Sequence, residues 1–556
     1  MIALGNRIRT LLGRPLLLSV AAIALTMLVL VLALPPALMQ NDEGVKLIQA
    51  QSLWQTGWRS RALPYPGATL DSTGAYFPLR PPFAWWHSGH WYGLYPTPFV
   101  ALSALAWRLG GLRAIFLLPW AAAVAAVALT GLCAERATGK PAAGAFAAFS
   151  VAVATPLALY GTLHFEHTIG VALLLGALVL IADPAPSWQK LILAGVLIGL
   201  GPMFRTELYC APFAVVPFAL VLWGPRPRTL GRLLVVGGVA LLLVSVHWLW
   251  NQLAFDTWEP VVSVNRMYNR RLLRTKSLSM FFPDSVPMLF GRAPWQALAL
   301  AALAGLCPTT RAPVRWLKLL LGTMAALWVG YLSWRALHLS GTGVGRTVLG
   351  CFATAPVLVL GLVRGPWPSG ATGRLGAACV AGGATFAAAI YWFDLEAKAG
   401  GLQLGARYML PAVPLLCVGA VELLWSRPRL LAPAVALLGA LSVAATLINL
   451  KAEAKIRREN ADVIAAVRST DGPVITNFFW VPHVLAPIYF ERPIFRTSFS
   501  SEMLVVDLFK HGVRKVVRVH GGLVEHRGDQ VIVKQDEVVL GPQQVIVYSL
   551  ASGEEP

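Results

Sequence analysis

The chain has 556 residues, of which 56% are hydrophobic and only 13% are charged. This composition excludes a set of soluble domains and indicates a protein that crosses a membrane many times. The net charge of +20 does not indicate nucleic-acid binding, because the Lys and Arg residues stand in short clusters between apolar runs, as topology determinants do. The six cysteines lie in or beside apolar segments without a CxxC spacing, so no disulfide framework is expected.

The first apolar run, residues 15–38, follows a basic N-terminus. It is longer than a signal-peptide core and lacks a convincing small-residue cleavage site, which predicts a retained signal anchor. Two adjacent carboxylates, Asp42 and Glu43, come directly after it in the stretch NDEG. They are either a solvated helix end that marks the membrane boundary or an acid placed where a lipid headgroup meets an aqueous substrate.

Residues 39–111 are too long for a simple turn and are predicted to cap the membrane domain. The stretches GVKLIQAQSLWQTGW and TPFVALSALAWRLGG are predicted to be helices lying at the interface, with Trp54, Trp58 and Trp107 as interfacial aromatic residues. Between them, aromatic runs flank Ser88 and Gly89 as in a β-hairpin.

A spanning helix needs roughly 20 apolar residues. On this basis the sequence predicts about thirteen spans, at 15–38, 112–133, 141–160, 168–183, 190–204, 207–224, 232–252, 287–307, 316–338, 343–363, 374–393, 407–426 and 430–450. With the N-terminus in the cytoplasm, the inside loops hold sixteen cations against only Glu135 and Asp183. That asymmetry fits the enrichment of cytoplasmic loops in Lys and Arg, and the odd number sends the C-terminus outside.

Two outside segments test this topology. Arg205 and Glu207 interrupt an apolar run, and because a charged pair deep in lipid is costly they are placed at an outside turn between two short helices. The loop 253–286 contains the basic stretch 266–276 on the side where cations are unexpected. Either the topology differs there, or these cations have an anionic partner such as a lipid.

The composition changes at about residue 451. The remaining segment alternates a polar helix, short strands and the helix SEMLVVDLFKHGV, so we predict a soluble α/β domain at 451–556, outside the membrane. The expected fold is thus an all-α polytopic membrane domain, residues 1–450, followed by a small α/β domain.

Several turns assigned to the outside carry ionisable groups, and packing the helices as one bundle would gather them around a common outward cavity. A metal site is disfavoured, because HFEH places its neighbouring side chains on different helical faces. Two of these groups have an alternative interpretation: Arg205 and Glu207 as a structural ion pair, and His338 as an interfacial anchor. The groups are His164, Glu166 and His167, then Arg205 and Glu207, then Arg335 and His338, and finally Arg407 and Tyr408.

A carboxylate base, cations and an apolar wall open to the bilayer suit the transfer of a sugar from a polyprenyl phosphate. The base takes a proton from an acceptor hydroxyl, which attacks the anomeric carbon from the face opposite the phosphate. The leaving phosphate needs its charge stabilised by Arg or Lys, and the product is inverted.

The acidic pair after the first helix, the long first outside loop and the C-terminal extracytoplasmic segment resemble the GT-C class of membrane glycosyltransferases. That class includes protein O-mannosyltransferases, the bacterial aminoarabinose transferase and oligosaccharyltransferases. The resemblance implies that Asp42 is the catalytic acid with Glu43 as second candidate, that YPTPF opens an interfacial helix, and that Arg407 and Tyr408 face the lipid phosphate. The chain lacks the WWDYG motif of oligosaccharyltransferases and the Glu/Lys-Pro-Pro signature of the aminoarabinose branch.

Lys46 follows the acidic pair by one helical turn, where it would pair with an acid, contact the donor phosphate or snorkel to the interface. Arg205 is a further candidate for binding the donor phosphate. The leading hypothesis is therefore an inverting glycosyltransferase of a bacterial-type inner membrane, without a cofactor, acting on a lipid, glycan or protein acceptor. Two alternatives stay open: a transporter or flippase of a lipid-linked glycan, although no matching halves are visible, and a non-catalytic partner in envelope-glycan assembly.

Overall fold

The computed structural model describes residues 15–39, 41–81, 83–183, 185–255, 293–308, 312–341, 350–367, 373–393, 407–497, 501–521, 533–540 and 543–550. By their internal contacts, the residues form two compact units. The first, called the helical unit, comprises residues 1–31, 119–260 and 269–452. The second, called the loop–sheet unit, comprises residues 32–118, 261–268 and 453–556.

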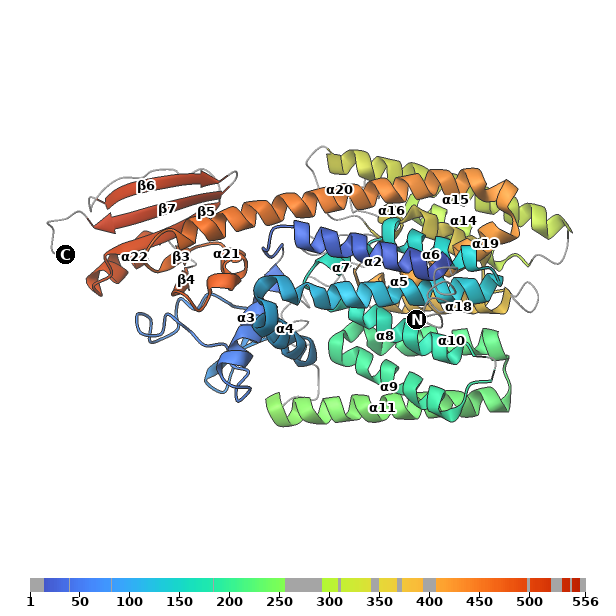
Figure 1. Cartoon of the computed structure of the whole chain (residues 1–556), viewed down its shortest axis with the longest axis horizontal. Coiled ribbons are helices and arrows are strands. Elements are labelled where there is room, and N and C mark those ends of the chain that lie inside the picture. The colour runs from blue at the N-terminus through green and yellow to red at the C-terminus, as the bar shows by residue number, and fades with distance from the viewer. Residues whose placement is uncertain are drawn as a thin grey trace, which may run out of the picture. The chain divides into compact units, whose positions relative to one another are not determined.

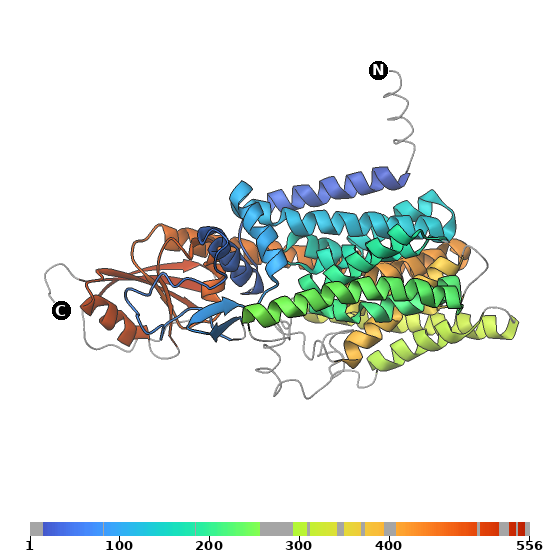
Figure 2. The same ribbon diagram turned by 90° about the horizontal axis from the view of Figure 1, so that it is seen from below.

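The helical unit is built from helices that run side by side over much of their length (Figures 1 and 2). Its elements are α2 (Pro15–Ala33), α5 (Leu117–Thr138), α6 (Pro141–Val153), α7 (Leu157–Thr162), α8 (His167–Ile181), α9 (Trp188–Phe204), η1 (Thr206–Cys210), α10 (Ala211–Trp223), α11 (Pro227–Phe255), α14 (Ala293–Leu306), α15 (Ala312–Gly341), α16 (Cys351–Thr354), η3 (Pro356–Leu358), α17 (Val359–Arg364), α18 (Gly373–Trp392), η4 (Arg407–Met409), α19 (Ala412–Ser426) and α20 (Pro428–Arg468). The part of α20 after residue 452 belongs to the loop–sheet unit.

Among the described residues, seven helices are long and apolar enough to cross a membrane. Five further apolar helices of 10–17 residues, α6, α8, α9, α14 and α19, fall short of that length. The chain is thus a multi-pass membrane protein by the length and composition of its helices, and the number of thirteen spans stays a prediction.

Two predicted helix ends differ from the structure because of proline. The run 15–38 is helical only to Ala33, since Pro35 and Pro36 follow. The expected helix 343–363 is, in its described part, three short helices, α16, η3 and α17. Ala355 leaves the helical conformation (φ −135°, ψ 63°) directly before Pro356, whose ring disfavours a helical residue in front of it.

The predicted span 430–450 and the polar helix predicted after residue 451 form one helix, because α20 continues from Pro428 to Arg468 without interruption (Figure 1). The stretch LKAEAKIRRENADVIAAVR contains neither Gly nor Pro and is rich in strong helix formers. The change from apolar to polar side chains therefore changes the surroundings of this helix without ending it.

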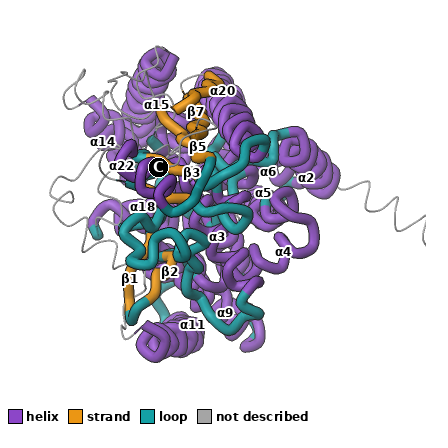
Figure 3. The backbone as a smooth tube through the Cα atoms, turned by 90° about the vertical axis from the view of Figure 1, so that its left-hand side faces the viewer, coloured by secondary structure: helices purple, strands orange, loops and turns teal. Residues whose placement is uncertain are grey.

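The loop–sheet unit contains a five-stranded sheet in the order β4-β3-β5-β7-β6. Strand β3 runs parallel to β4 and β5, whereas the pairs β5–β7 and β7–β6 are antiparallel. Strands β3, β5 and β7, drawn in orange in Figure 3, lie next to one another. Its elements are α3 (Asn41–Gln55), β1 (Ala84–His87), β2 (His90–Gly93), α4 (Thr97–Ile115), β3 (Val474–Thr476), α21 (Val481–Val484), η5 (Ala486–Ile488), β4 (Ile494–Arg496), α22 (Ser501–Lys510), β5 (Lys515–Gly521), β6 (Val533–Leu540) and β7 (Gln543–Leu550).

The β-hairpin predicted around Ser88 and Gly89 is confirmed, with β1 and β2 antiparallel. Both turn residues have positive φ, 47° and 79°, as a two-residue turn of type I′ requires. The helices predicted on either side of the hairpin are also present, as α3 and α4.

The first long loop and the C-terminal segment fold together. The Asn460 side chain donates a hydrogen bond to the Leu38 carbonyl (2.7 Å), and the Tyr489 hydroxyl donates to the Pro64 carbonyl (2.9 Å). The Arg457 guanidinium lies over the Phe116 ring, 4.3 Å from its centroid. Residues 453–556 therefore share one compact unit with residues 32–118.

Candidate functional site

Asp42 and Glu43 lie in the first turn of α3, separated from the end of α2 by a non-helical segment. One Asp42 carboxylate oxygen accepts a hydrogen bond from the Tyr95 hydroxyl at 2.7 Å. Glu43 accepts one from the backbone N–H of Met39 at 2.7 Å. Asp42 is partly exposed, whereas Glu43 is completely buried. The two neighbouring acids therefore occupy different environments.

Lys46 is completely buried one turn further along α3. Its Nζ lies 4.9 Å from the centroid of the Tyr95 ring and 5.6 Å from that of Phe99. Such contacts are cation–π interactions, which strengthen when the cation is desolvated. A snorkelling role is excluded by this burial, and Lys46 instead contacts the tyrosine that binds Asp42.

The YPTPF stretch positions these rings. Pro96 precedes the first residue of α4 with an extended ψ of 121°, and a proline also occupies the first turn of this helix, where a missing N–H is harmless. Tyr95 thus lies just before α4, while Phe99 lies inside it. Helix α4 packs against α3 through Ala50, Leu53, Val100 and Ala104.

Sequence reasoning missed His483, at the other side of α3. This residue lies on α21 and is 1% exposed, and a Cβ built on Gly44 would stand only 2.3 Å from its carbonyl oxygen. Its ring meets that of Phe83 with centroids 4.5 Å apart. The glycine of NDEG is therefore required for close packing of α3, and only the contact with a residue 439 positions later reveals it.

A second polar cluster lies within the helical unit. Arg205 donates through Nη1 to Glu166 (2.7 Å) and through Nε to both Glu207 oxygens (2.9 and 3.0 Å). Glu166 is fully buried and Glu207 is 2% exposed. Because a buried carboxylate is costly without a charged partner, the guanidinium holds both acids in place.

Aromatic and imidazole rings complete this cluster. His167 Nδ1 lies 3.3 Å from Glu207 Oε1, and its ring is edge-on to that of Tyr408 with centroids 6.1 Å apart. Arg205 and Arg407 both lie over the Tyr408 ring, 5.2 and 5.1 Å from its centroid. The Arg407 Nη2 also donates to the Tyr408 hydroxyl at 3.4 Å.

Local geometry explains why these turns meet. Helix α9 ends at Phe204, and Arg205 is extended (φ −144°, ψ 125°) before the 3₁₀ turn η1 that carries Glu207. Glu166 immediately precedes α8. The predicted break at Arg205 and Glu207 is therefore confirmed, and the structure joins three of the four predicted ionisable turns.

The remaining predicted residues lie elsewhere or add little geometry. His164 is fully buried two residues before Glu166. Arg335 belongs to α15, where it is half-buried next to Trp334, whose ring stacks on that of His338 with centroids 6.0 Å apart. The basic stretch 266–276 lies outside the described residues. In the described part of the chain, no three His, Cys, Asp or Glu side chains gather as metal ligands would.

No family model matches the chain, and no curated protein matches it. Among solved structures, the oligosaccharyltransferase of Archaeoglobus fulgidus is similar, with 13% identity and a TM-score of 0.48 over 90% of this chain and 67% of that one. ArnT of Cupriavidus metallidurans bound to undecaprenyl phosphate has 14% identity and a TM-score of 0.46, and the match covers 98% of this chain and 100% of that one. The arabinofuranosyltransferase AftD from Mycobacteria has 14% identity and a TM-score of 0.36. The match covers 96% of this chain and 40% of AftD, so the chain spans less than half of AftD. The likeness is distant, and functional roles rest on this chain's own residues.

Proposed function

We propose that the chain is a GT-C-type glycosyltransferase that moves a sugar from a polyprenyl phosphate to an acceptor hydroxyl. The observation that carries this proposal is the environment of Asp42. This carboxylate is partly exposed, oriented by the Tyr95 hydroxyl at 2.7 Å and set at the start of a helix that follows a membrane anchor. A general base needs this combination of fixed orientation and access to the acceptor.

The two acids receive different roles. Asp42 is the general base, because its carboxylate reaches solvent. Glu43 is a positioning residue, because it is buried and bound to the backbone N–H of Met39, which fixes the entry to α3. Lys46 acts on the base indirectly by holding the Tyr95 ring.

The reaction is a single displacement. Asp42 takes the proton of the acceptor hydroxyl as its oxygen bonds to the anomeric carbon, and the bond from that carbon to the phosphate oxygen breaks. The polyprenyl phosphate leaves with the bonding electron pair, so it needs cations to stabilise its charge. Inversion at the anomeric carbon follows from attack opposite the leaving group.

We assign the contact with the donor phosphate mainly to Arg407 and Tyr408. Arg205 carries one positive charge between two buried carboxylates, Glu166 and Glu207, and is already largely neutralised by them. It lies over the Tyr408 ring, 5.2 Å from the centroid, so its proposed contribution to phosphate binding is indirect. The donor is a lipid-linked sugar, and the reaction takes place at the outer face of a bacterial-type inner membrane.

The test uses the purified full chain with a panel of radiolabelled polyprenyl-phosphate sugars and membrane extract as the source of acceptors. Asp42→Asn should lower transfer by at least about 100-fold, the lower range for loss of a general base. Its melting temperature should match that of the wild type, because Asn keeps an oxygen that accepts from Tyr95.

Glu43→Gln is the matched control for the neighbouring acid. It keeps an acceptor for the Met39 N–H, so transfer should fall far less than in Asp42→Asn. If Glu43→Gln lowered transfer more than Asp42→Asn did, the role of general base would be assigned to Glu43 instead. If the wild type neither transferred nor hydrolysed the sugar of any donor, this result would contradict the proposal that the chain is a glycosyltransferase.

A further inference from the structure

A cavity of about 650 Å³ lies in the helical unit between α15, α17, α19 and α20. Four cationic side chains, Arg315, Lys318, Arg364 and Arg427, line it together with one carboxylate, Glu422. The rest of the lining is mostly leucine, valine and alanine, with Trp367. The cavity therefore combines an excess of positive charge with a long apolar wall.

The inner cations are fixed by the protein itself. Arg364 binds both Glu422 oxygens, at 3.0 Å through Nε and 2.7 Å through Nη2, and donates to the carbonyl of Gly373 at 2.8 Å. Lys318 Nζ donates to the Arg364 carbonyl at 2.9 Å. Glu422 is thus already balanced by Arg364, and the other cations of the lining are in excess.

Arg315 and Arg427 differ from the inner pair because both are exposed. Arg315 lies on the first turns of α15, and Arg427 directly follows α19. Both line the same cavity, which places two solvated guanidinium groups beside the apolar wall. An amphiphile with an anionic head and a hydrocarbon tail matches this division.

The cavity lies at the opposite end of α19 from the cluster of Arg407 and Tyr408. The 15 residues of α19 separate the two by about 22 Å at 1.5 Å per residue. Near the cavity, Trp425 contacts Phe146 of α6, with ring centroids 5.3 Å apart. The turn before α6 carries Lys140, one of the cations that the charge pattern assigns to the cytoplasm.

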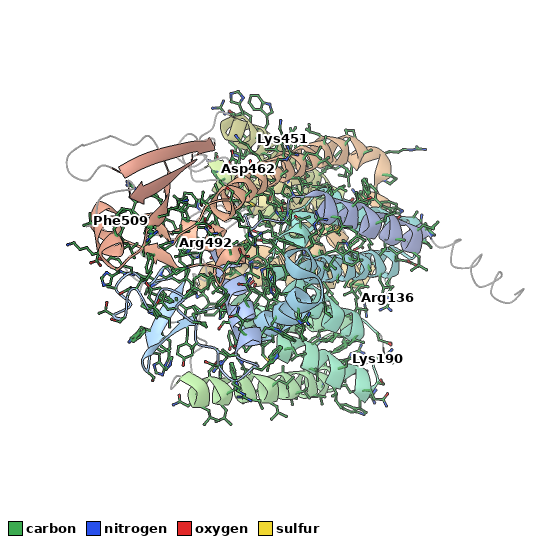
Figure 4. The ribbon with its side chains drawn as sticks, turned by 60° about the vertical axis from the view of Figure 1, so that its left-hand side comes forward. Arg136, Lys190, Lys451, Asp462, Arg492 and Phe509 are labelled. Carbon is green, nitrogen blue, oxygen red and sulfur yellow. The ribbon has the colours of Figure 1, made fainter. Side chains whose placement is uncertain are left out.

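Cations of other turns lie at this end too. Arg136 at the end of α5 and Lys190 at the start of α9 point outward at one end of the helices (Figure 4). A basic pocket among helices on the cytoplasmic side is suited to an anionic lipid head, since each cation near such a head contributes favourably.

We propose that this cavity binds an anionic phospholipid of the cytoplasmic leaflet, such as phosphatidylglycerol, as a structural lipid. Arg315 and Arg427 bind the phosphate, because a guanidinium group can donate two parallel hydrogen bonds to phosphate oxygens. One acyl chain lies along the wall that includes Thr323, Leu327 and Leu437. The site is independent of the glycosyl transfer proposed above, because it lies about 22 Å from the phosphate contact.

The experiment titrates the detergent-solubilised full chain with phosphatidylglycerol and, separately, with phosphatidylcholine of the same acyl chains. Native mass spectrometry counts bound lipid, and the melting temperature reports stabilisation of the fold. The wild type should bind phosphatidylglycerol and melt at a higher temperature, with a clearly smaller effect of phosphatidylcholine. Inorganic phosphate alone should have no effect, because it cannot use the apolar wall.

Arg315→Gln with Arg427→Gln should weaken the apparent affinity for phosphatidylglycerol by about 30-fold, at roughly fivefold per cation near an anionic head. The matched control is Arg226→Gln with Arg228→Gln, two exposed arginines of another turn, which should bind within twofold of the wild type. Thr323→Trp keeps every charge but fills the wall, and should also abolish lipid binding.

Equal shifts with the two lipids, or an equal shift with inorganic phosphate, would overturn the proposal. So would unchanged binding by either the double arginine variant or Thr323→Trp. The readouts do not involve sugar transfer, so a failure here leaves the assignment of Asp42 standing and the reverse also holds.

Discussion

Neighbouring residues of identical chemistry take different roles here because their side chains leave α3 in different directions. Asp42 faces Tyr95 and solvent, whereas Glu43 faces the backbone of Met39 in a fully buried site. Successive residues of a helix point about 100° apart, so an acidic pair presents only one carboxylate to any given site. We therefore propose that the pair is a base with a structural neighbour.

Tyr95→Phe removes the hydroxyl that donates to Asp42 and leaves the ring that Lys46 contacts. We expect transfer to fall by about tenfold, since a hydrogen bond to a charged group contributes about 1.5–3 kcal/mol. The acidic limb of the pH–rate profile should move to higher pH, because the ionised carboxylate loses a donor. Tyr76→Phe, half-buried in the same unit, should leave the profile unchanged.

Asp71, in the loop between α3 and β1, accepts four hydrogen bonds. It accepts from the hydroxyls of Tyr65 (2.7 Å) and Thr73 (2.9 Å) and from the N–H groups of Ala75 (3.1 Å) and Tyr76 (2.7 Å). Burial alone would raise the pKa of Asp71, but these bonds outweigh it and hold the pKa below its ordinary value of 3.8. The ionised form therefore stabilises the fold.

The sign of the pH dependence follows from that lowered pKa. The stabilisation is complete at pH values above the unfolded pKa and is lost as pH falls through the lower pKa of the folded state. Asp71→Asn should reduce the free energy of unfolding by about 2 kcal/mol at pH 7. The difference from the wild type should shrink below about pH 4 in thermal melts. A constant difference, or an equal loss in exposed Asp462→Asn, would contradict this role.

Helix packing in the helical unit depends on close backbone approach. A Cβ on Gly361 of α17 would lie 2.3 Å from the Leu416 carbonyl of α19, and one on Gly305 of α14 would lie 2.3 Å from the Leu362 carbonyl. Small residues let helices meet in this way where lipid supplies no hydrophobic drive. The three helices α14, α17 and α19 are therefore joined through glycine.

Gly361→Ala should destabilise the fold by about 1–3 kcal/mol, the usual effect of overpacking. Gly439→Ala on α20 is the matched control, because a Cβ there meets nothing within 4 Å. This control should be neutral or stabilise by up to about 1 kcal/mol through helix propensity. Melting temperatures in one detergent compare the two, and equal values would contradict the packing role of Gly361.

At the scale of the whole molecule, the loop–sheet unit unites segments more than 400 residues apart. Asn460 and Leu38 share a hydrogen bond across 422 positions, and Tyr489 and Pro64 across 425. The capping loop thus depends on the C-terminal segment for its fold. Loss of either should damage both, including the helix that carries Asp42.

Asn460→Ala tests this dependence with a single change. It leaves the Leu38 carbonyl without its buried donor, which should cost about 1–3 kcal/mol. Trypsin should then cut more rapidly at Arg59 and Arg80, and transfer should fall in parallel. Asp462→Ala, exposed on the same helix and labelled in Figure 4, is the control that should change neither. Unaltered proteolysis of Asn460→Ala would show that the loop folds without this bond.

Sequence patterns predicted much of the local structure because they reflect local causes. Apolar length predicted the helices, Ser88 and Gly89 predicted the hairpin, and the charged interruption at Arg205 predicted the break between α9 and α10. The change of polarity near residue 450 lies close to the division between the two units at residues 452 and 453, although α20 runs through it. The pattern failed at Ala355, where one Ala-Pro step breaks an otherwise apolar segment.

The sequence by itself determined a multi-pass chain, and it predicted an acidic pair at the start of a helix and four ionisable turns. Only the tertiary structure decided that Tyr95 binds Asp42, that Arg205 lies between Glu166 and Glu207, and that His483 packs on Gly44. Hydrophobic length and backbone preference act within a few residues, whereas partner choice depends on which helices pack together. Our proposal that Asp42 is the base rests on its burial and that of Glu43, which no spacing of residues encodes.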